Sequence, residues 1–303
     1  MSEPAAADEA IDPALEREYA LRARHPERQS VYDRMAAASA AFRERAPARL
    51  AERYADGPRC TLDLFTVPGA ARPTPLLVFV HGGYWRALDN RIFSYLARAW
   101  TETGIAVAMP GYDLSPGVGL HRIADELEAA LRWLGERADA LGLRRDAVVL
   151  SGHSAGGHLA AVLAARDPAR LGGIRARGVA GLSGLYDLAP LRRTSIGRDV
   201  RFGPDVLATL NPIDFARFEP AAFVLGWGGL ETEGFRSQSL AFAARLRALG
   251  HRVATVEAAG RTHFDLLDDL ADPAAPLFAA TRALFDPPPL PRPDPPPAPQ
   301  DTR

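Results

Sequence analysis

The sequence predicts an α/β fold in which a mainly parallel central sheet carries helices on both faces. Short apolar runs, typical of strands buried on both sides, alternate with longer segments whose apolar residues recur at helical spacing. Such alternation is characteristic of parallel strands joined by right-handed helical crossovers. The chain has 303 residues, which is enough for one large domain of this kind, although length alone would also allow two.

The elements follow this rhythm along the chain. We expect strands at residues 60–67, 76–80, 105–109, 147–150, 178–182, 221–226 and 253–256. Helices are expected between them at residues 91–103, 123–141, 155–165 and 235–249. Two stretches do not fit the alternation. Residues 13–53 are helical in pattern, and residues 186–220 are interrupted by prolines, so we place cap elements at 13–56 and 186–220 within one domain that spans 13–285.

The two ends have a different composition. Residues 1–12 form an acidic leader, and residues 286–303 are dominated by proline, which predicts a disordered or polyproline II tail. The leader lacks the apolar segment of a secretory signal, so we expect a cytoplasmic protein. No stretch approaches the ~18 apolar residues of a membrane span.

Charge and cysteine content narrow the class of protein. The chain has 36 basic and 37 acidic residues, a balance that offers no footprint for nucleic acid or an anionic membrane. Its one cysteine, Cys60, excludes an intrachain disulfide, fits a reducing compartment and is expected to be a small buried residue. We therefore expect a small-molecule substrate as the partner, and the sequence leaves a homodimer open.

The strongest motif is GHSAG at residues 152–156. It follows the buried strand 147–150 and opens a helix made of small residues. A nucleophile elbow needs this setting, because its sharp strand-to-helix turn presents the central serine and requires small neighbours. We therefore predict the α/β-hydrolase fold, with Ser154 as nucleophile.

A second glycine motif, HGGYW at residues 81–85, directly follows the strand 76–80. In this fold the loop at that position donates backbone N–H groups to the oxyanion, and glycines such as Gly82 and Gly83 let the backbone approach the substrate. The predicted donors are the N–H groups of Gly83, Tyr84 and Ala155.

The general base is chosen by position among seven histidines. His263 follows the last predicted strand, as the fold's order of serine, acid and histidine requires. The other six lie in polar segments, beside the two glycine motifs or at a turn. These are His25, His81, His121, His153, His158 and His251.

The acid should follow the strand 221–226. Glu231 comes first after the glycine turn at 226–229 and is our choice, with Glu233 and Asp187 as alternatives. Together these residues predict a triad in which His263 removes the proton of Ser154 and Glu231 orients the imidazole. We expect no cofactor and no metal, because the glycines match neither a dinucleotide fingerprint nor a P-loop, and no Cys/His cluster has metal-ligand spacing.

Several segments resemble one family. HGGYW is similar to the HGGxW motif of the kynurenine formamidases (arylformamidases) of α/β-hydrolase type, which are relatives of hormone-sensitive-lipase-like carboxylesterases. The resemblance covers about residues 14–285. Its other segments are residues 15–19, 112–116, 152–159, 184–188, 235–239 and 263–265.

By this resemblance, Ser154 and His263 are the nucleophile and base, and the glycines of HGGYW form the oxyanion loop. The family's acid is usually aspartate, whereas the corresponding place here holds Glu231. The implied activity is hydrolysis of N-formyl-kynurenine to kynurenine and formate, a step of tryptophan breakdown. Trp85 and Tyr112 would offer aromatic surface to such a substrate, or merely pack in the pocket wall.

Three functions remain open at this stage. The first is an arylformamidase, supported by Trp85 after the glycines and by the matching segments. The second is a carboxylesterase for short acyl or aryl esters, which needs the same triad and no special pocket. The third is a non-catalytic binding protein on the same fold, since fold alone does not confer activity.

Overall fold

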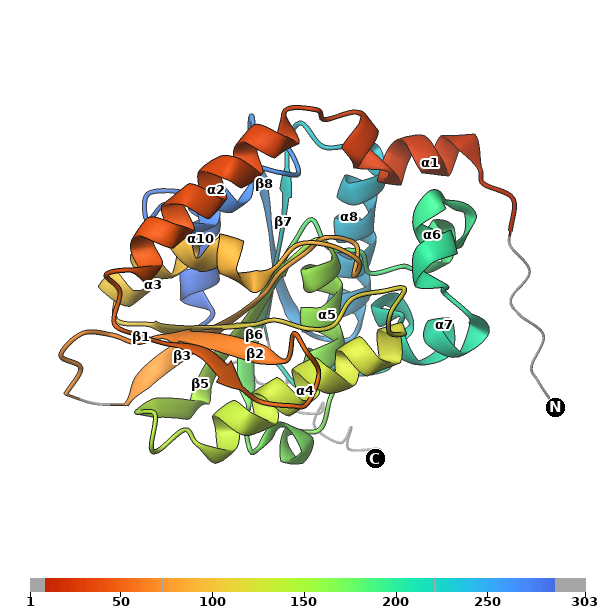
Figure 1. Cartoon of the computed structure of the whole chain (residues 1–303). Helices are drawn as coiled ribbons and strands as arrows, with labels where there is room; N and C mark the ends of the chain where they lie inside the picture. Colours follow the sequence, from red (N-terminus) through yellow and green to blue (C-terminus); the bar gives the residue numbers. More distant parts are fainter. Residues whose placement is uncertain (1–8, 72, 221, 287–303) are drawn as a thin grey trace, which may run out of the picture.

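The protein is built around one eight-stranded sheet with strand order β1-β2-β4-β3-β5-β6-β7-β8 (Figure 1). This computed structural model describes residues 9–71, 73–220 and 222–286. Most of the predicted acidic leader, residues 1–8, and all but the first residue of the predicted proline-rich tail lie outside the described residues. In the part of the chain that is described, no helix is long and apolar enough to cross a membrane.

The six strands from β3 to β8 run parallel to one another, and β2 and β1 are added at one edge in antiparallel pairs. The predicted mainly parallel sheet of an α/β-hydrolase fold is therefore confirmed. The strand bounds are β1 Ala48–Arg53, β2 Thr61–Phe65, β3 Thr74–Val80, β4 Ala106–Pro110, β5 Leu143–His153, β6 Ala176–Leu182, β7 Ala222–Gly228 and β8 Arg252–Ala258.

Helices cover both faces, and the side chains of β3 show how. Leu76, Val78 and Val80 pack in one apolar cluster, whereas Leu77 and Phe79 pack in the other, as the alternation of a strand requires. The first face is covered by α4 (Leu120–Glu136), α5 (Ala155–Ala164) and α8 (Glu233–Ala248). The opposite face is covered by α2 (Arg28–Arg43), η2 (Asn90–Leu96), α3 (Ala97–Glu102), α9 (Leu267–Leu270) and α10 (Pro276–Ala283). Burial on both sides explains why the central strands are continuous apolar runs.

The segment predicted as helix up to residue 53 ends differently. Residues 48–53 form β1, which pairs antiparallel with β2 from Ala48 opposite Phe65 to Arg53 opposite Thr61. The register shifts between Arg49 and Glu52, where the N–H of Ala51 donates to the Asp63 carboxylate at 2.9 Å. The residues of β1 favour a helix when isolated, but pairing with an open sheet edge overrides that local preference. The prediction of a cap element reaching to residue 56 was therefore wrong for this part.

The remaining non-alternating segments lie beside each other. The N-terminal part contains α1 (Pro13–Tyr19) and η1 (Leu21–Ala23). The Glu16 carboxylate accepts the N–H of Ser195 at 2.7 Å, and the N–H of Asp12 donates to the carbonyl of Arg193 at 2.8 Å. These bonds join α1 to the helices of residues 186–220, which Figure 1 shows at the same end of the molecule. The helices of residues 186–220 are η4 Ala189–Arg193, α6 Ser195–Val200, α7 Pro204–Leu210 and η5 Pro212–Asp214. Outside this segment, the short helix η3 (Pro168–Leu171) follows α5.

Candidate active site

Ser154 occupies the turn between β5 and α5, where its backbone has φ 56° and ψ −121°. The neighbouring glycines are required by close packing. A Cβ at Gly152 would lie 2.1 Å from the carbonyl oxygen of Gly156, and a Cβ at Gly156 would lie 2.0 Å from that of Val80. The N–H of Ser154 donates to the carbonyl of Leu182 at 2.8 Å, which fixes the turn against β6. This is the strained elbow geometry that presents a serine at the carboxyl edge of the sheet.

A small cavity lies beside Ser154 and also contacts His263, which comes from the segment after β8. Its volume is about 20 Å³. Its buried lining combines the polar residues Ser154, His153 and His263 with aromatic and apolar ones, and we call the side lined by the partly exposed residues its mouth; these are Arg22, Tyr32, Gly83 and Leu88. The complete lining consists of Arg22, Tyr32, Gly83, Tyr84, Leu88, Phe93, His153, Ser154, His263, Phe264 and Leu267.

The carboxylate that meets His263 is Glu231. Its Oε2 lies 3.0 Å from His263 Nδ1, and the side chains of the two residues are 0% and 5% exposed, respectively. Glu231 Oε1 accepts the N–H of Gly228 at 2.7 Å and the hydroxyl of Ser183. Because the carboxylate binds Nδ1, it favours the tautomer in which Nε2 can accept a proton.

The alternative acids lie elsewhere. Glu233 is 65% exposed and pairs with Arg236 at the start of α8. The Asp187 carboxylate accepts the N–H of Ala189 within its own loop at 3.0 Å. Among the three carboxylates considered from the sequence, the structure thus brings only Glu231 to His263.

The glycine loop after β3 lies against the nucleophile. A Cβ at Gly82 would lie 2.7 Å from the His153 carbonyl oxygen and 3.1 Å from the Ser154 Cβ. Gly83 has φ 111°, and a Cβ there would lie 2.2 Å from the Ala87 carbonyl oxygen. Gly83 and Tyr84 both line the cavity, and Ala155 begins α5 directly after Ser154. The three predicted N–H donors therefore come from segments that meet at the serine.

The two predicted aromatic substrate contacts are buried elsewhere. Trp85 is 0% exposed, and its ring packs edge-on against His158 and Phe202. Tyr112 is also 0% exposed; its ring stacks on His81 with 4.2 Å between centroids, and its hydroxyl donates to the His81 carbonyl at 2.8 Å. Neither residue lines the cavity. Their assignment as substrate-binding residues is corrected to support of the glycine loop, because neighbouring rings occupy the faces that a substrate would need.

Comparison with known proteins places this arrangement in a family. Residues 62–173 match the protein family described as BD-FAE. A Silicibacter sp. TM1040 protein, provisionally named a thioesterase, is 34% identical in a structural match that covers 89% of this chain and 99% of the other, with a TM-score of 0.77. Kynurenine formamidases from Salmo salar and Drosophila melanogaster are 23% and 27% identical. Each match covers 72% of this chain, and 76% and 75% of those relatives, respectively.

The chain belongs to the α/β-hydrolases and is similar to both the kynurenine formamidases and the carboxylesterases. The esterase LipC from Mycobacterium tuberculosis is also a relative. It is 27% identical in a match that covers 71% of this chain and 59% of LipC. The fold is shared more widely, as the metagenomic carboxylesterase EstE1 shows with a TM-score of 0.67 at 19% identity, over 86% of this chain and 96% of that one. The protein is therefore a hydrolase, as the sequence predicted.

Sequence reasoning missed several residues of the hydrolase site. His153 lines the cavity, and its ring centroid lies 4.5 Å from that of His263. Burial and the neighbouring His263 hold the pKa of His153 well below its usual value, so this ring stays neutral. Arg22 and Tyr32 reach the cavity from the N-terminal segment, far from the motifs in sequence. Ser183 carried one usable signal, its place directly after the strand β6, where parallel strands gather functional side chains.

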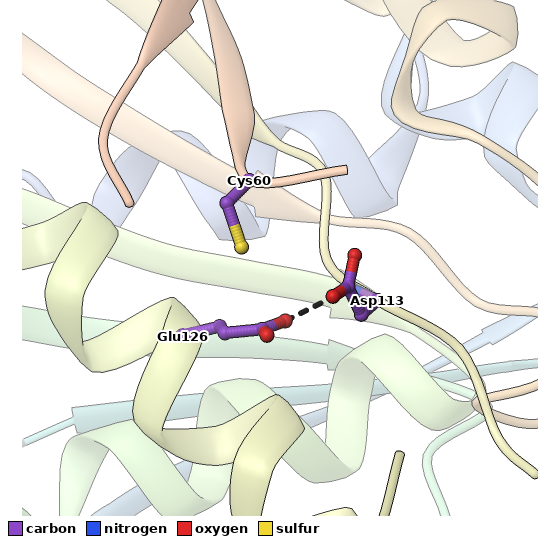
Figure 2. Close-up of side chains that lie close together, drawn as sticks. All are labelled: Cys60, Asp113 and Glu126. Atoms are coloured by element: carbon purple, nitrogen blue, oxygen red, sulfur yellow. Dashed lines mark hydrogen bonds between the residues drawn. The ribbon is translucent and has the colours of Figure 1, made fainter. Parts of the chain in front are cut away.

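A second polar cluster lies away from Ser154 (Figure 2). The ligand-type atoms of Cys60, Asp113 and Glu126 lie within 4.8 Å of one another, and all three residues are buried. The N–H of Asp113 donates to Glu126 Oε2 at 2.9 Å, and Arg122 donates to Oε1 at 2.7 Å. Burial confirms the expectation for Cys60 and raises the pKa of its thiol to about 11, so the sulfur stays protonated.

Both Glu126 oxygens already accept hydrogen bonds from within the protein, and the Asp113 carboxylate accepts the N–H of Arg59 at 3.0 Å. We therefore interpret the cluster as structural. It holds the loop that carries Tyr112, whose ring supports His81 at the start of the glycine loop. This cluster could not be predicted from local patterns, because Cys60, Asp113 and Glu126 are widely separated along the chain.

Proposed function

We propose that this hydrolase cleaves an aryl formamide, with N-formyl-L-kynurenine as substrate and L-kynurenine and formate as products. Curated kynurenine formamidases are among its relatives, and they match over most of their own length. The size of the cavity beside Ser154 also supports a small acyl group as substrate. A water-sized group needs about 10–15 Å³ of such space, and the cavity offers about 20 Å³.

This space suits the one-carbon formyl group better than a longer acyl chain. A longer chain would have to displace Phe93, Phe264 or Leu267, which are 2%, 6% and 1% exposed. Displacing packed core side chains costs about 1–3 kcal/mol. The formyl group would therefore occupy the inner end of the cavity, and the arylamine part would extend toward the mouth.

The proposed mechanism has two stages. His263 takes the proton of Ser154 as the serine oxygen attacks the formyl carbon, and the N–H groups of Gly83, Tyr84 and Ala155 stabilise the oxyanion. His263 then gives that proton to the arylamine nitrogen as the C–N bond breaks, leaving a formyl ester on Ser154. Water attacks this ester with the same proton transfers and releases formate. Glu231 keeps the imidazole oriented and stabilises its cation, which its 3.0 Å contact with Nδ1 supports.

The test compares kcat/KM for N-formyl-L-kynurenine with that for a short-chain aryl ester. Carboxylesterase activity is the second candidate, favoured by the esterase relatives. We expect the formamide to be preferred. A preference for the ester above about a hundredfold, equal to about 2.7 kcal/mol of transition-state binding, would contradict the formamidase proposal.

A fluorophosphonate probe tests catalysis itself. It should label the wild-type protein and fail to label Ser154→Ala, because the probe reacts with an activated serine. No labelling of the wild type would favour a non-catalytic binding protein instead.

A further inference from the structure

Arg22 is a cation at the mouth of the cavity that holds Ser154 and His263. It lies in η1 and is partly exposed. Most arginines of this chain donate to a carboxylate or a carbonyl, as Arg86 does to Asp199 and Arg28 does to the carbonyl of Arg22. Within the described residues, the guanidinium of Arg22 has neither a hydrogen-bond acceptor nor an ion-pair partner. Its five N–H donors are therefore available to a ligand.

Arg22 lies near a second cation, Arg86, whose own partner is Asp199. Burial lowers the pKa of Arg86, and the nearby charge of Arg22 lowers it further. Tyr32 also lines the cavity. Burial raises the pKa of its hydroxyl, and the nearby charges of Arg22 and Arg28 oppose that rise. Asp199 neutralises Arg86, whereas Arg22 has no such partner among the described residues, and a bound anion would supply one. The mouth of the cavity thus favours an anionic group.

The position of Arg22 is fixed by the backbone around it. Leu21 beside it is 1% exposed, and Arg28 donates to the Arg22 carbonyl at 2.5 Å. The carbonyl of Tyr19, three residues earlier, accepts the hydroxyl of Tyr84 from the glycine loop. The backbone that carries the cation is therefore tied to the loop that borders the nucleophile, so the fold keeps Arg22 beside the cavity.

We propose that Arg22 is a specificity-determining residue that binds a carboxylate on the arylamine part of the substrate. This inference rests on the proposed function, since it places the formyl group in the cavity at Ser154 and the carboxylate outside it, at Arg22, which borders the same cavity. Arginine suits the role because its planar fork matches a carboxylate with two parallel hydrogen bonds. Tyr32 and Phe264, whose rings meet edge to face at 5.9 Å, also line the cavity and offer aromatic surface to the arylamine.

The experiment uses the full chain and two formamides that differ only by the carboxylate, N-formyl-L-kynurenine and N-formylkynuramine. The quantity measured is the ratio of their kcat/KM values. We expect the wild type to prefer the carboxylate substrate at least tenfold. Arg22→Gln should lower that ratio at least tenfold, mainly through KM, because the lost contact is also made in the bound ground state. Arg22→Lys, which keeps the charge but not the fork, should retain an intermediate ratio.

Arg24 provides the matched control. It lies two residues away, is exposed and donates to the Arg17 carbonyl at 2.8 Å. Arg24→Gln removes a positive charge from the same segment, and we expect it to leave the ratio within twofold of wild type. An equal loss on both substrates in Arg22→Gln, or an equal fall of the ratio in both variants, would overturn the assignment.

A second measurement separates this inference from the proposed function. Hydrolysis of 4-nitrophenyl acetate, a neutral ester, is followed in the presence of L-kynurenine or of kynuramine, which lacks the carboxylate. We expect the inhibition constant of L-kynurenine to rise at least tenfold in Arg22→Gln, with the selectivity over kynuramine lost. If the wild type cleaves the ester and neither formamide, the proposed function fails, and this inhibition still decides the role of Arg22. If L-kynurenine and kynuramine inhibit the wild type equally, the assignment of Arg22 as the carboxylate-binding residue is overturned.

Discussion

The hydroxyl of Tyr84 donates a hydrogen bond to the backbone carbonyl of Tyr19. Both side chains are 5% exposed, so the bond is shielded from water. Tyr84 has φ 53°, a strained conformation that its surroundings must maintain. The bond therefore couples the N-terminal segment to the glycine loop beside Ser154.

Tyr84→Phe should weaken both stability and catalysis. The substitution leaves the Tyr19 carbonyl without its donor, which costs about 1–3 kcal/mol for a buried acceptor. We expect kcat to fall several-fold, because the loop that carries the proposed oxyanion donors is held less firmly. Urea unfolding and steady-state kinetics measure the two effects. Tyr54→Phe is the control, since it removes a similar bond to the Gly111 carbonyl outside the cavity; equal kinetic losses in both variants would contradict the coupling.

Glu231→Gln should lower kcat at least a hundredfold with little change in folding. The amide is nearly the same size, but it cannot stabilise the imidazolium and disturbs the tautomer of His263. Single-turnover kinetics and thermal unfolding are the measurements. Glu233→Gln, two residues away and exposed, should remain within twofold of wild type. Near-wild-type activity of Glu231→Gln would remove the acid role from this residue.

Ser183→Ala tests how the carboxylate is held. Ser183 donates to Glu231 Oε1 and has φ 46°, directly after β6. Without this hydroxyl, Glu231 keeps the Gly228 N–H and the His263 contact, so we expect kcat to fall about three- to tenfold, equivalent to about 1 kcal/mol. A pH profile of kcat/KM should shift with the variant, because one fewer donor changes the charge balance of the acid–base pair. An unchanged kcat and profile would contradict this positioning role.

Local patterns predicted the central strands and the geometry at Ser154, because both depend on neighbours in sequence. The continuous apolar runs reflect burial on two faces, and the glycines around Ser154 reflect backbone contacts within a few residues. His263 and Glu231 were predicted from their order after the strands. The 3.0 Å contact between them could be inferred only because parallel strands end at one edge.

Other features depend on contacts that no local pattern carries. β1 was predicted as helix because Ala, Glu and Arg favour helices, and only the open edge of β2 makes it a strand. Trp85 was expected beside the substrate, but a partner ring from Phe202, more than a hundred residues later, encloses it. Arg22 reaches the cavity because the cap segment folds back over the sheet, which its own helical sequence does not indicate.

Trp85→Ala should destabilise the protein by about 3–5 kcal/mol, the usual cost of removing a fully buried large side chain. The ring fills space between His158 and Phe202 and does not line the cavity. We therefore expect Trp85→Phe to retain KM for N-formyl-L-kynurenine within about threefold while lowering the unfolding free energy. Urea denaturation and steady-state kinetics distinguish a packing role of Trp85 from a role in substrate binding. A large rise of KM in Trp85→Phe with unchanged stability would restore Trp85 as a substrate contact.

The unfolding free energy should fall as the pH drops from 7 to 5.5, because three histidines are fully buried. Burial lowers the pKa of His81 and of His158 to about 4, and that of His153 well below its usual value. In the unfolded chain each titrates near pH 6.5. The unfolded state therefore binds more protons, and the stabilisation is complete above pH 6.5 and is lost as the pH falls toward 4.

Between pH 7 and 5.5 the unfolding free energy should fall by about 1 kcal/mol per histidine. Ordinary carboxylates titrate below this pH interval, so they add little to the change. Urea unfolding at each pH measures it. His158→Gln can keep a donor to the Leu210 carbonyl, which His158 Nε2 contacts at 2.7 Å, and should remove about one third of the pH dependence. His121→Gln, at an exposed site, should leave the dependence unchanged. A stability that stays constant from pH 7 to 5.5 would mean that these imidazoles accept protons without leaving the core, and that their burial does not determine their charge.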